Sequence, residues 1–276
     1  MSINVINIEN DIMKHNDLDL NNWKELDIDV NSLWLINERD KSGKHANVYH
    51  GNFIPQIPYQ LISRYTKKND IVLDLFLGSG TTLFECENLN RDFIGFDIND
   101  KIISFVKSKM DSNSNINYDI QNCDVSNSVD FDIKITKSLE KLRANKIQLL
   151  IMHPPYMDIV KFTDKEEDLS QISDLSQFVK VFNKVVTNGL KYLEINRYFA
   201  IVIGDVYKDG EVKPLAFYTM DIVKRNFKVK LKGIIVKNIE GNRGKLGKGG
   251  IWRYRALKSD YYIFKHEYIF IFKKEF

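Results

Sequence analysis

The sequence contains little cysteine, with only Cys86 and Cys123 among its 276 residues. Two isolated thiols cannot form the dense disulfide framework of a small secreted domain, and their spacing matches no zinc-binding pattern. Each lies in a segment with the apolar pattern of a buried helix or strand, so both are predicted to be core thiols. The low cysteine content favours the reducing cytoplasm as the location of the protein.

Long apolar runs are also lacking. No stretch of the sequence reaches the ~18–20 apolar residues that a membrane-spanning helix needs, and residues 1–40 hold no apolar run of the signal-peptide type. The formal net charge of +3 is too small to indicate a partner by itself. Hydrophobic residues make up 43% of the chain, which is enough for a sizeable core. We expect an extension over residues 1–40 and a single domain over residues 41–276.

Short apolar runs alternate with amphipathic stretches along most of the chain. This alternation predicts repeated β–α units and a mainly parallel sheet. The predicted strands are residues 71–76, 92–97, 117–124, 148–153 and 198–204. The predicted helices are residues 80–90, 99–112, 132–145, 175–194 and 214–226. The end of the chain differs, because residues 227–237 and 261–273 have the pattern of consecutive strands with no helix between them, which predicts an antiparallel hairpin.

A glycine-rich turn, Leu77-Gly78-Ser79-Gly80-Thr81-Thr82, joins the first predicted strand to the next helix. Glycine lets a ligand approach the backbone, and the amides at a helix N-terminus favour an anionic group. The turn lacks the third glycine of a dinucleotide site and the Gly-Lys-Ser/Thr of a phosphate-binding loop. Asp97 ends the next strand and could accept both hydroxyls of a ribose, while Asp124 could accept an adenine amine; each could instead cap a helix or loop.

A second turn, His153-Pro154-Pro155-Tyr156, follows the apolar run 148–152. Two prolines make the turn rigid, remove two amide donors and leave carbonyl oxygens free to accept hydrogen bonds. Methylation of an exocyclic amine needs acceptors for the two amine hydrogens, and an aromatic face can stack on a flipped base. Taken alone, Pro-Pro-Tyr is also compatible with an ordinary strand-ending turn.

Taken together, these segments resemble the amino-group DNA methyltransferases. Residues 74–82 look like motif I of that family, residues 49–58 look like the motif X that closes over the methionine end of the cofactor, and residues 153–156 are similar to its Asp/Asn/Ser-Pro-Pro-Tyr/Phe site. The resemblance covers roughly residues 45–276. It implies an α/β class I methyltransferase (Rossmann-like) fold, a mainly parallel seven-stranded sheet with an antiparallel terminal hairpin strand, and S-adenosylmethionine as the cofactor.

The resemblance and the turn chemistry together assign roles to individual residues. The cofactor-binding residues expected in this way are Phe53, Pro55, Gln56, Asp74, Phe76, Gly78, Ser79, Gly80, Thr81, Thr82, Asp97, Ile98 and Asp124. The catalytic residues are His153, Pro154, Pro155 and Tyr156, and no metal is expected. In the family, the first residue of this site and the carbonyl of the first proline accept the amine hydrogens. His153 departs from that pattern, although a neutral imidazole can accept through one nitrogen, and this leaves the target base open.

Residues 241–258 carry six basic residues and no acidic one. Basic side chains contact phosphates and aromatic rings stack on bases, so a mobile hairpin loop over residues 238–262 is expected to bind double-stranded DNA; an ordinary solvated loop is the alternative. The expected DNA-binding residues are Arg243, Lys245, Lys248, Trp252, Arg253, Tyr254 and Arg255. A second small loop, residues 157–174, is expected to contact DNA, with a weak contribution from Arg39 and Lys44.

The leading hypothesis is a site-specific DNA methyltransferase that acts on adenine N6 or cytosine N4 of a flipped base, as in restriction-modification systems. An RNA methyltransferase of the guanine-N2 type carries a similar turn and is the second hypothesis. The third, which His153 keeps open, is a catalytically silent subunit that binds DNA or cofactor. A cognate restriction nuclease or a second subunit is a conceivable partner, and a membrane is not.

Overall fold

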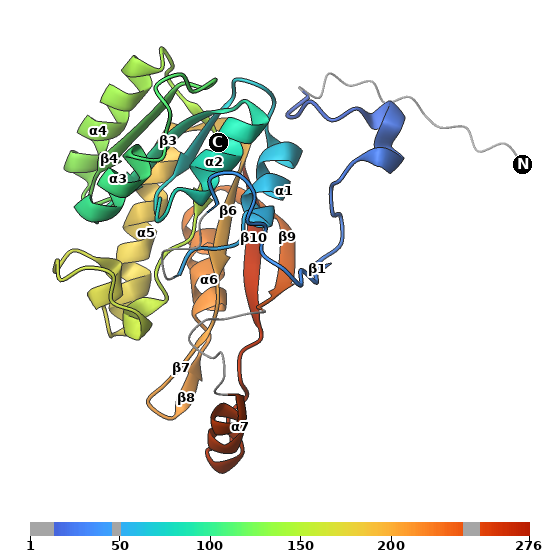
Figure 1. Ribbon diagram of the computed structural model, residues 1–276. Helices are drawn as coiled ribbons and strands as arrows, with labels where there is room; N and C mark the ends of the chain where they lie inside the picture. The colour runs from blue at the N-terminus through green and yellow to red at the C-terminus, as the bar shows by residue number, and fades with distance from the viewer. Residues whose placement is uncertain (1–13, 46–50, 240–248) are drawn as a thin grey trace, which may run out of the picture.

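The computed structural model describes residues 14–45, 51–239 and 249–276, in which helices cover both faces of one large sheet (Figure 1). The sheet has eight strands in the order β1-β9-β10-β6-β5-β2-β3-β4. Their bounds are β1 Leu33–Trp34, β2 Ile71–Asp74, β3 Asp92–Asp97, β4 Tyr118–Asn122, β5 Ile147–Met152, β6 Leu193–Ile203, β9 Val229–Asn238 and β10 His266–Lys274. The strands from β6 to β4 are parallel to one another, which confirms the predicted α/β class.

The two faces of the sheet are covered by different helices because successive side chains of a strand point to opposite faces. On one face Val72 and Leu149 pack with α1 (Gln56–Tyr65), α2 (Thr81–Leu89) and α3 (Asp100–Lys107). On the other face Leu73 and Leu150 pack with α4 (Ser128–Lys141), α5 (Leu175–Tyr192) and α6 (Leu215–Asn226). The continuous apolar runs of the central strands follow from this burial on both faces.

Local sequence signals set several helix starts. The side chains of Asn99, Asn127 and Asp174 accept hydrogen bonds from backbone N–H groups in the first turns of α3, α4 and α5. Such caps satisfy amides that have no partner inside the helix. The cap at Asn127 also explains why α4 begins at Ser128, four residues before the predicted start.

The antiparallel end of the sheet confirms the predicted hairpin pairing. Strand β10 lies between β6 and β9 and is antiparallel to both, with Ile271 opposite Ala200 and Ile269 opposite Ile235. The predicted number of seven strands is wrong, because the short β1 adds to the outer edge of β9, where Leu33 is opposite Val236.

The absence of a helix between the last two strands was also a wrong prediction. Helix α7 spans Gly249–Lys258 and precedes β10. The glycines of this segment end at position 250, and the residues that follow are compatible with a helix. The segment is therefore not a glycine-rich loop throughout, and 240–248 lie outside the described residues.

The smaller elements were not predicted from the sequence. They are the antiparallel hairpin of β7 (Val206–Lys208) and β8 (Glu211–Lys213), and the 3-10 turns η1 (Leu20–Glu25), η2 (Met157–Ile159) and η3 (Leu169–Gln171). Hairpin β7–β8 and helix α7 extend from the same end of the molecule (Figure 1), and the Tyr207 and Tyr261 rings stack with centroids 4.7 Å apart. Among the described helices, none combines the length and the apolar character needed to cross a membrane.

Candidate active site

The two predicted turns lie side by side at one edge of the sheet. Strand β2 is parallel to both β3 and β5, with Asp74 opposite Gly95 on one side and Ile151 on the other. The segments that leave the carboxyl ends of these strands therefore meet, as is usual for ligand sites of open α/β sheets. A cavity of about 670 Å³ lies at this edge, within the size range of small-molecule sites.

The structure divides the predicted cofactor residues into two groups. Those that line the cavity are Phe53, Phe76, Gly78, Thr81, Asp97, Ile98 and Asp124. Those outside its lining are Pro55, Gln56, Asp74, Ser79, Gly80 and Thr82. The residues of the second group lie in the same segments of the chain as the lining residues.

Asp74 and Gly80 show how these residues shape the turn. Asp74 is buried and accepts hydrogen bonds from Thr82 Oγ1 at 2.5 Å and from the Phe76 N–H at 2.9 Å, and burial raises its pKa to about 6. Gly80 has a φ of +85°, and a Cβ there would lie 2.9 Å from Val106 Cγ1 on α3. Only glycine fits both requirements. The conformation of the motif I-like turn is thus set by the hydrogen bonds of Asp74 and by the close packing of Gly80 on α3.

The segment before α1 is tied to the same turn. Asn52 Nδ2 donates to Ser79 Oγ at 2.8 Å, and Pro55 is the residue that precedes the first turn of α1. Gln56 accepts from the Asp40 N–H at 3.3 Å and donates to the Glu38 carbonyl at 2.7 Å. Phe53 thereby reaches the cavity, whereas Tyr49 and His50 lie outside the described residues.

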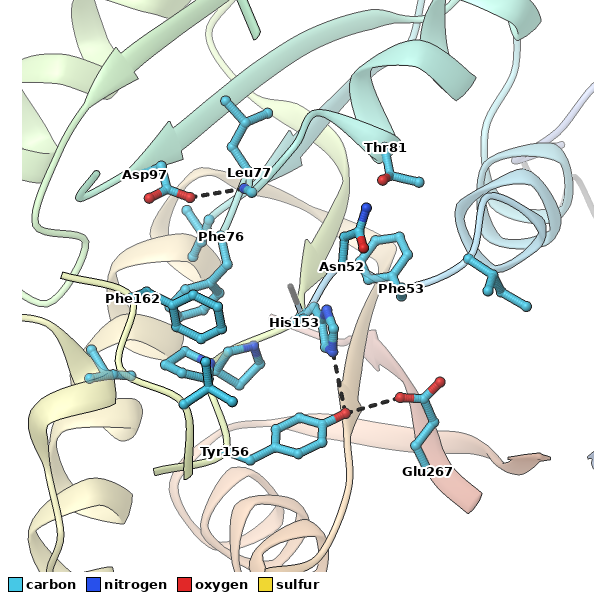
Figure 2. Close-up of a pocket in the computed structure, with 18 of the residues that line it drawn as sticks. Asn52, Phe53, Phe76, Leu77, Thr81, Asp97, His153, Tyr156, Phe162 and Glu267 are labelled. Carbon is cyan, nitrogen blue, oxygen red and sulfur yellow. Dashed lines mark hydrogen bonds between the residues drawn. The ribbon is translucent and has the colours of Figure 1, made fainter. Parts of the chain in front are cut away.

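Asp97 and Asp124 stand at neighbouring strand ends. The Asp97 carboxylate accepts from the Gly78 N–H at 2.9 Å (Figure 2). It also accepts from the Asn99 N–H at 2.9 Å. Burial raises the pKa of Asp97 to about 6 against the effect of these two bonds. Asp124 Oδ1 accepts from the backbone and the hydroxyl of Ser126 at 2.9 and 2.8 Å. Both acids line the cavity, as a ribose and adenine site would require.

All four residues of the His-Pro-Pro-Tyr turn line the same cavity. His153 Nε2 lies 3.3 Å from the Tyr156 hydroxyl, which donates to Glu267 Oε2 at 3.0 Å (Figure 2). Lys237 Nζ donates to the other carboxylate oxygen of Glu267 at 3.1 Å. The Phe53 ring packs on His153 with centroids 5.0 Å apart. A chain of polar contacts therefore runs from Lys237 to His153.

Burial sets the protonation of this turn. Burial disfavours the imidazolium and lowers the pKa of His153 to about 4, with Glu267 opposing the shift and Lys237 adding to it. Burial and the neighbouring Glu267 raise the pKa of Tyr156 well above its ordinary value. At neutral pH the site therefore presents a neutral imidazole and a protonated phenol.

Lys237 and Glu267 were missed by the sequence analysis. They line the cavity, are opposite one another on β9 and β10, and are 5% and 7% exposed. The available signal was weak, because β9 also holds Lys230 and Lys232 and β10 also holds Lys273 and Lys274. Their pairing depends on the register between two strands that are separated in the sequence, which periodicity does not provide.

The predicted nucleic-acid residues are only partly placed. Trp252, Arg253, Tyr254 and Arg255 lie on α7, where the last three are exposed and the Arg255 guanidinium lies 5.5 Å from the Trp252 ring centroid. Arg243, Lys245 and Lys248 lie outside the described residues.

Arg39 and Lys44 are held within the domain. Arg39 Nη1 donates to the Phe53 carbonyl at 2.8 Å. Lys44 forms ion pairs with Glu87 at 2.7 Å and Asp111 at 3.1 Å. Each cation is thus engaged within the fold, and its contribution to a charged face stays a prediction.

The loop of residues 157–174 covers one side of the cavity. Phe162, Asp168 and Leu169 line it, and a Cβ on Gly51 would lie 2.8 Å from Phe162 Cζ. Lys165 Nζ donates to the Ile98 carbonyl at 2.7 Å and pairs with Asp100 at 2.8 Å. These contacts fasten the loop next to the Asp97 end of the cavity.

The lowered pKa of His153 predicts that its imidazole stays neutral down to about pH 5. In the unfolded chain the same group titrates near its ordinary value of 6.5, so this residue alone makes stability rise with pH between about 4 and 6.5. Proton NMR of the histidine ring signals, assigned with a His153→Asn variant, should show no His153 transition between pH 5 and 8. A midpoint near 6.5 would contradict the burial argument.

Two sequence comparisons bear on the family. A family model described as DNA methylase, of the N6/N4 type, matches residues 2–108. The Type II methyltransferase M.HpaI of Haemophilus parainfluenzae is 45% identical over 62 residues, which are 22% of this chain and 20% of that protein. The Type II methyltransferase M.MjaII of Methanocaldococcus jannaschii is 37% identical over 84 residues, 28% of this chain and 16% of that protein. The matched stretches thus span about a fifth or less of these relatives.

Solved structures align with more of the chain at lower identity. The structure of TrmN from Thermus thermophilus covers 82% of this chain and 50% of its own, with a TM-score of 0.48 and 14% identity. The structure of SMU.1697c from Streptococcus mutans, a putative methyltransferase in complex with SAH, covers 79% of this chain and 96% of its own, with a TM-score of 0.47 and 14% identity. The sequence matches cover less than half of the chain, and they support its similarity to the amino-group (N6-adenine and N4-cytosine) S-adenosylmethionine-dependent DNA methyltransferases.

Proposed function

We propose that this chain transfers a methyl group from S-adenosylmethionine to the exocyclic amine of adenine (N6) or cytosine (N4) in DNA. The observation that carries the proposal is that Gly78, Asp97 and the 153–156 turn line one cavity. The match of residues 2–108 to the DNA methylase family model supports the same reaction. The Type II names of the relatives extend the proposal to a site-specific enzyme of a restriction-modification system, with a cognate nuclease as its partner.

The chemistry of the cavity wall fits the cofactor. S-adenosylmethionine, when bound, supplies an electrophilic methyl group. Asp97 would accept the ribose hydroxyls, and Asp124 with Ile98 would hold the adenine. Phe53, Phe76 and the Gly78–Thr81 turn would enclose the remainder. The residues of this segment outside the cavity lining, which are Asp74, Ser79, Gly80 and Thr82, keep this shape.

The 153–156 turn would hold the target amine. The neutral His153 and the Pro154 carbonyl are acceptors for its two hydrogens, which orients the nitrogen lone pair. The Tyr156 ring would stack on the flipped base. Gly204 permits the ring to lie where it does, because a Cβ there would be 3.0 Å from Tyr156 Cε2.

The proposal predicts label transfer from S-adenosylmethionine to DNA. Purified protein is incubated with isotopically labelled cofactor and with DNA or RNA, and the digested nucleosides are analysed by mass spectrometry. Label in N6-methyladenine or N4-methylcytosine is expected, and a Tyr156→Ala variant should lose it. Label confined to RNA would favour the guanine-N2 type of enzyme. Cofactor binding without transfer to either polymer would favour a silent subunit.

Replacing Asp97 with Asn should weaken cofactor binding about tenfold or more, since a hydrogen bond to a charged group contributes about 1.5–3 kcal/mol. Because the pKa of Asp97 is about 6, cofactor affinity should also depend on pH. Bound hydroxyls favour the carboxylate, so affinity should rise with pH up to about 6 and then level off. Calorimetry between pH 5 and 8 measures both effects. Asp221→Asn on α6 is the control, and equal affinity of the Asp97→Asn protein would refute the ribose assignment.

The exposed cations of α7 are proposed to contact DNA phosphates. Helix α7 lies between the end of β9 and the start of β10, and thus at the same edge of the sheet as the cavity. Replacing Arg253 and Arg255 with Ala should weaken DNA binding and reduce the salt slope by about 2, one unit for each lost phosphate contact. Affinity is measured by fluorescence anisotropy at several salt concentrations.

The matched control for α7 replaces Lys107 and Lys109, which are exposed at the far end of α3. Helix α3 starts at the carboxyl end of β3 and runs back across the sheet, so these lysines lie away from the cavity edge. The control should leave the salt slope unchanged. An unaltered slope for the Arg253 and Arg255 variant would remove α7 from the interface.

A further inference from the structure

We infer that Glu267, held by Lys237, acts through the Tyr156 hydroxyl to fix His153 in the tautomer that carries its hydrogen on Nε2, so that Nδ1 is the acceptor for the target amine. Glu267, Lys237 and the Tyr156 hydroxyl are positioning groups in this scheme, and they act on the amine only through His153. The inference rests on the proposed function, because that function supplies the amine.

The first step is the charge state of Glu267. Its side chain is buried with that of Lys237, and the ammonium lies 3.1 Å from Oε1. The two residues are opposite one another on adjacent antiparallel strands, which fixes the pair in place. A buried carboxylate next to an ammonium is stabilised in its ionised form. An ionised carboxylate has no hydrogen to donate and can only accept.

The second step is the direction of the bond between Tyr156 and Glu267. Since Glu267 can only accept, the hydroxyl must donate across the 3.0 Å contact to Oε2. A hydroxyl has a single hydrogen. The Tyr156 oxygen therefore has only lone pairs left to offer to any other neighbour.

The third step concerns the imidazole. His153 Nε2 lies 3.3 Å from the Tyr156 oxygen, and two lone pairs facing one another at that distance would repel. Nε2 must therefore carry the hydrogen. The imidazole is neutral at pH 7, since burial lowers its pKa to about 4. A neutral imidazole has one hydrogen on nitrogen, so Nδ1 is left with its lone pair.

The last step is where that lone pair lies. Figure 2 shows one nitrogen of His153 turned toward Tyr156 and the other turned away from it. Among the described residues, none forms a hydrogen bond with Nδ1, and the His153 side chain lines the cavity. The Phe53 ring packs at 56° against the imidazole and restrains it. In place of the oxygen acceptor of the family pattern, this chain offers the imidazole Nδ1. The Lys237–Glu267 pair makes this nitrogen a hydrogen-bond acceptor by fixing the tautomer.

The test uses protein labelled with ¹⁵N-histidine. Long-range ¹H–¹⁵N correlation spectra distinguish a protonated ring nitrogen from an unprotonated one. For wild-type His153 we expect a protonated Nε2 and an unprotonated Nδ1 at pH 7. The opposite tautomer would overturn the inference.

Glu267→Gln is the decisive variant. Its amide oxygen can still accept from Lys237, while its NH₂ group donates to the Tyr156 oxygen. The Tyr156 hydroxyl then donates to Nε2, and His153 should change to the Nδ1–H tautomer. We expect kcat for DNA methylation to fall about 10²-fold, the loss typical of removing one positioned hydrogen-bonding group. KM for DNA and Kd for the cofactor should change less than about threefold, because neither ligand touches Glu267.

Tyr156→Phe and Glu211→Gln complete the set. The Tyr156→Phe variant keeps the aromatic ring and removes the hydroxyl, so His153 should show a mixture of tautomers. This measurement tests the inference even if the Glu267→Gln protein does not fold. Glu211→Gln, on the exposed strand β8, should change neither the tautomer nor kcat.

The outcomes separate the inference from the proposed function. An unchanged tautomer in Glu267→Gln, or a changed tautomer with wild-type kcat, overturns the inference and leaves methyl transfer intact. Absence of transfer by the wild-type protein overturns the proposed function and, with it, the amine as the ligand of Nδ1.

Discussion

Strands β2 and β5 are parallel neighbours, and the pairing of Asp74 with Ile151 places their carboxyl ends together. Every residue of the site depends on this contact. The glycine-rich turn leaves one strand and the His-Pro-Pro-Tyr turn leaves the other, so the cofactor half and the target half of the cavity share a wall. The helices packed on both faces hold the two strands in that register, because a slip by one residue would turn the apolar side chains out of both cores.

The antiparallel hairpin completes the target half of the cavity. Placing β10 between β6 and β9 brings Glu267 within hydrogen-bonding distance of the Tyr156 hydroxyl and opposite Lys237. Burying two charges is costly, and a pair of this kind persists where its remaining hydrogen-bonding capacity is satisfied. Here the second carboxylate oxygen accepts from Tyr156. The same buried environment lowers the pKa of His153 and keeps its imidazole neutral. Burial thus acts both on the ion pair and on the histidine of the turn.

Several elements of the fold were predictable from local pattern. Strand β3 has the predicted bounds, and β2, β5 and helices α2 to α6 lie within a few residues of theirs, whereas helix α1 was not predicted. Their signals are apolar runs buried on both faces and helix caps such as Asn99. Helix α7 and the edge strand β1 were not predictable, because one follows a glycine-rich stretch and the other is too short to show periodicity. Strand β1 forms by pairing with the distant strand β9.

The sequence by itself determined the α/β fold and the two turns to which the proposed function assigns the cofactor and the target amine, because each follows from contiguous residues. It also showed that His153 stands where the family has an oxygen acceptor. Only the tertiary structure decided which atoms surround that histidine. Lys237 and Glu267 lie 30 positions apart, and no spacing rule connects them. Their effect on His153 arises from strand register and burial, and both are properties of the folded chain.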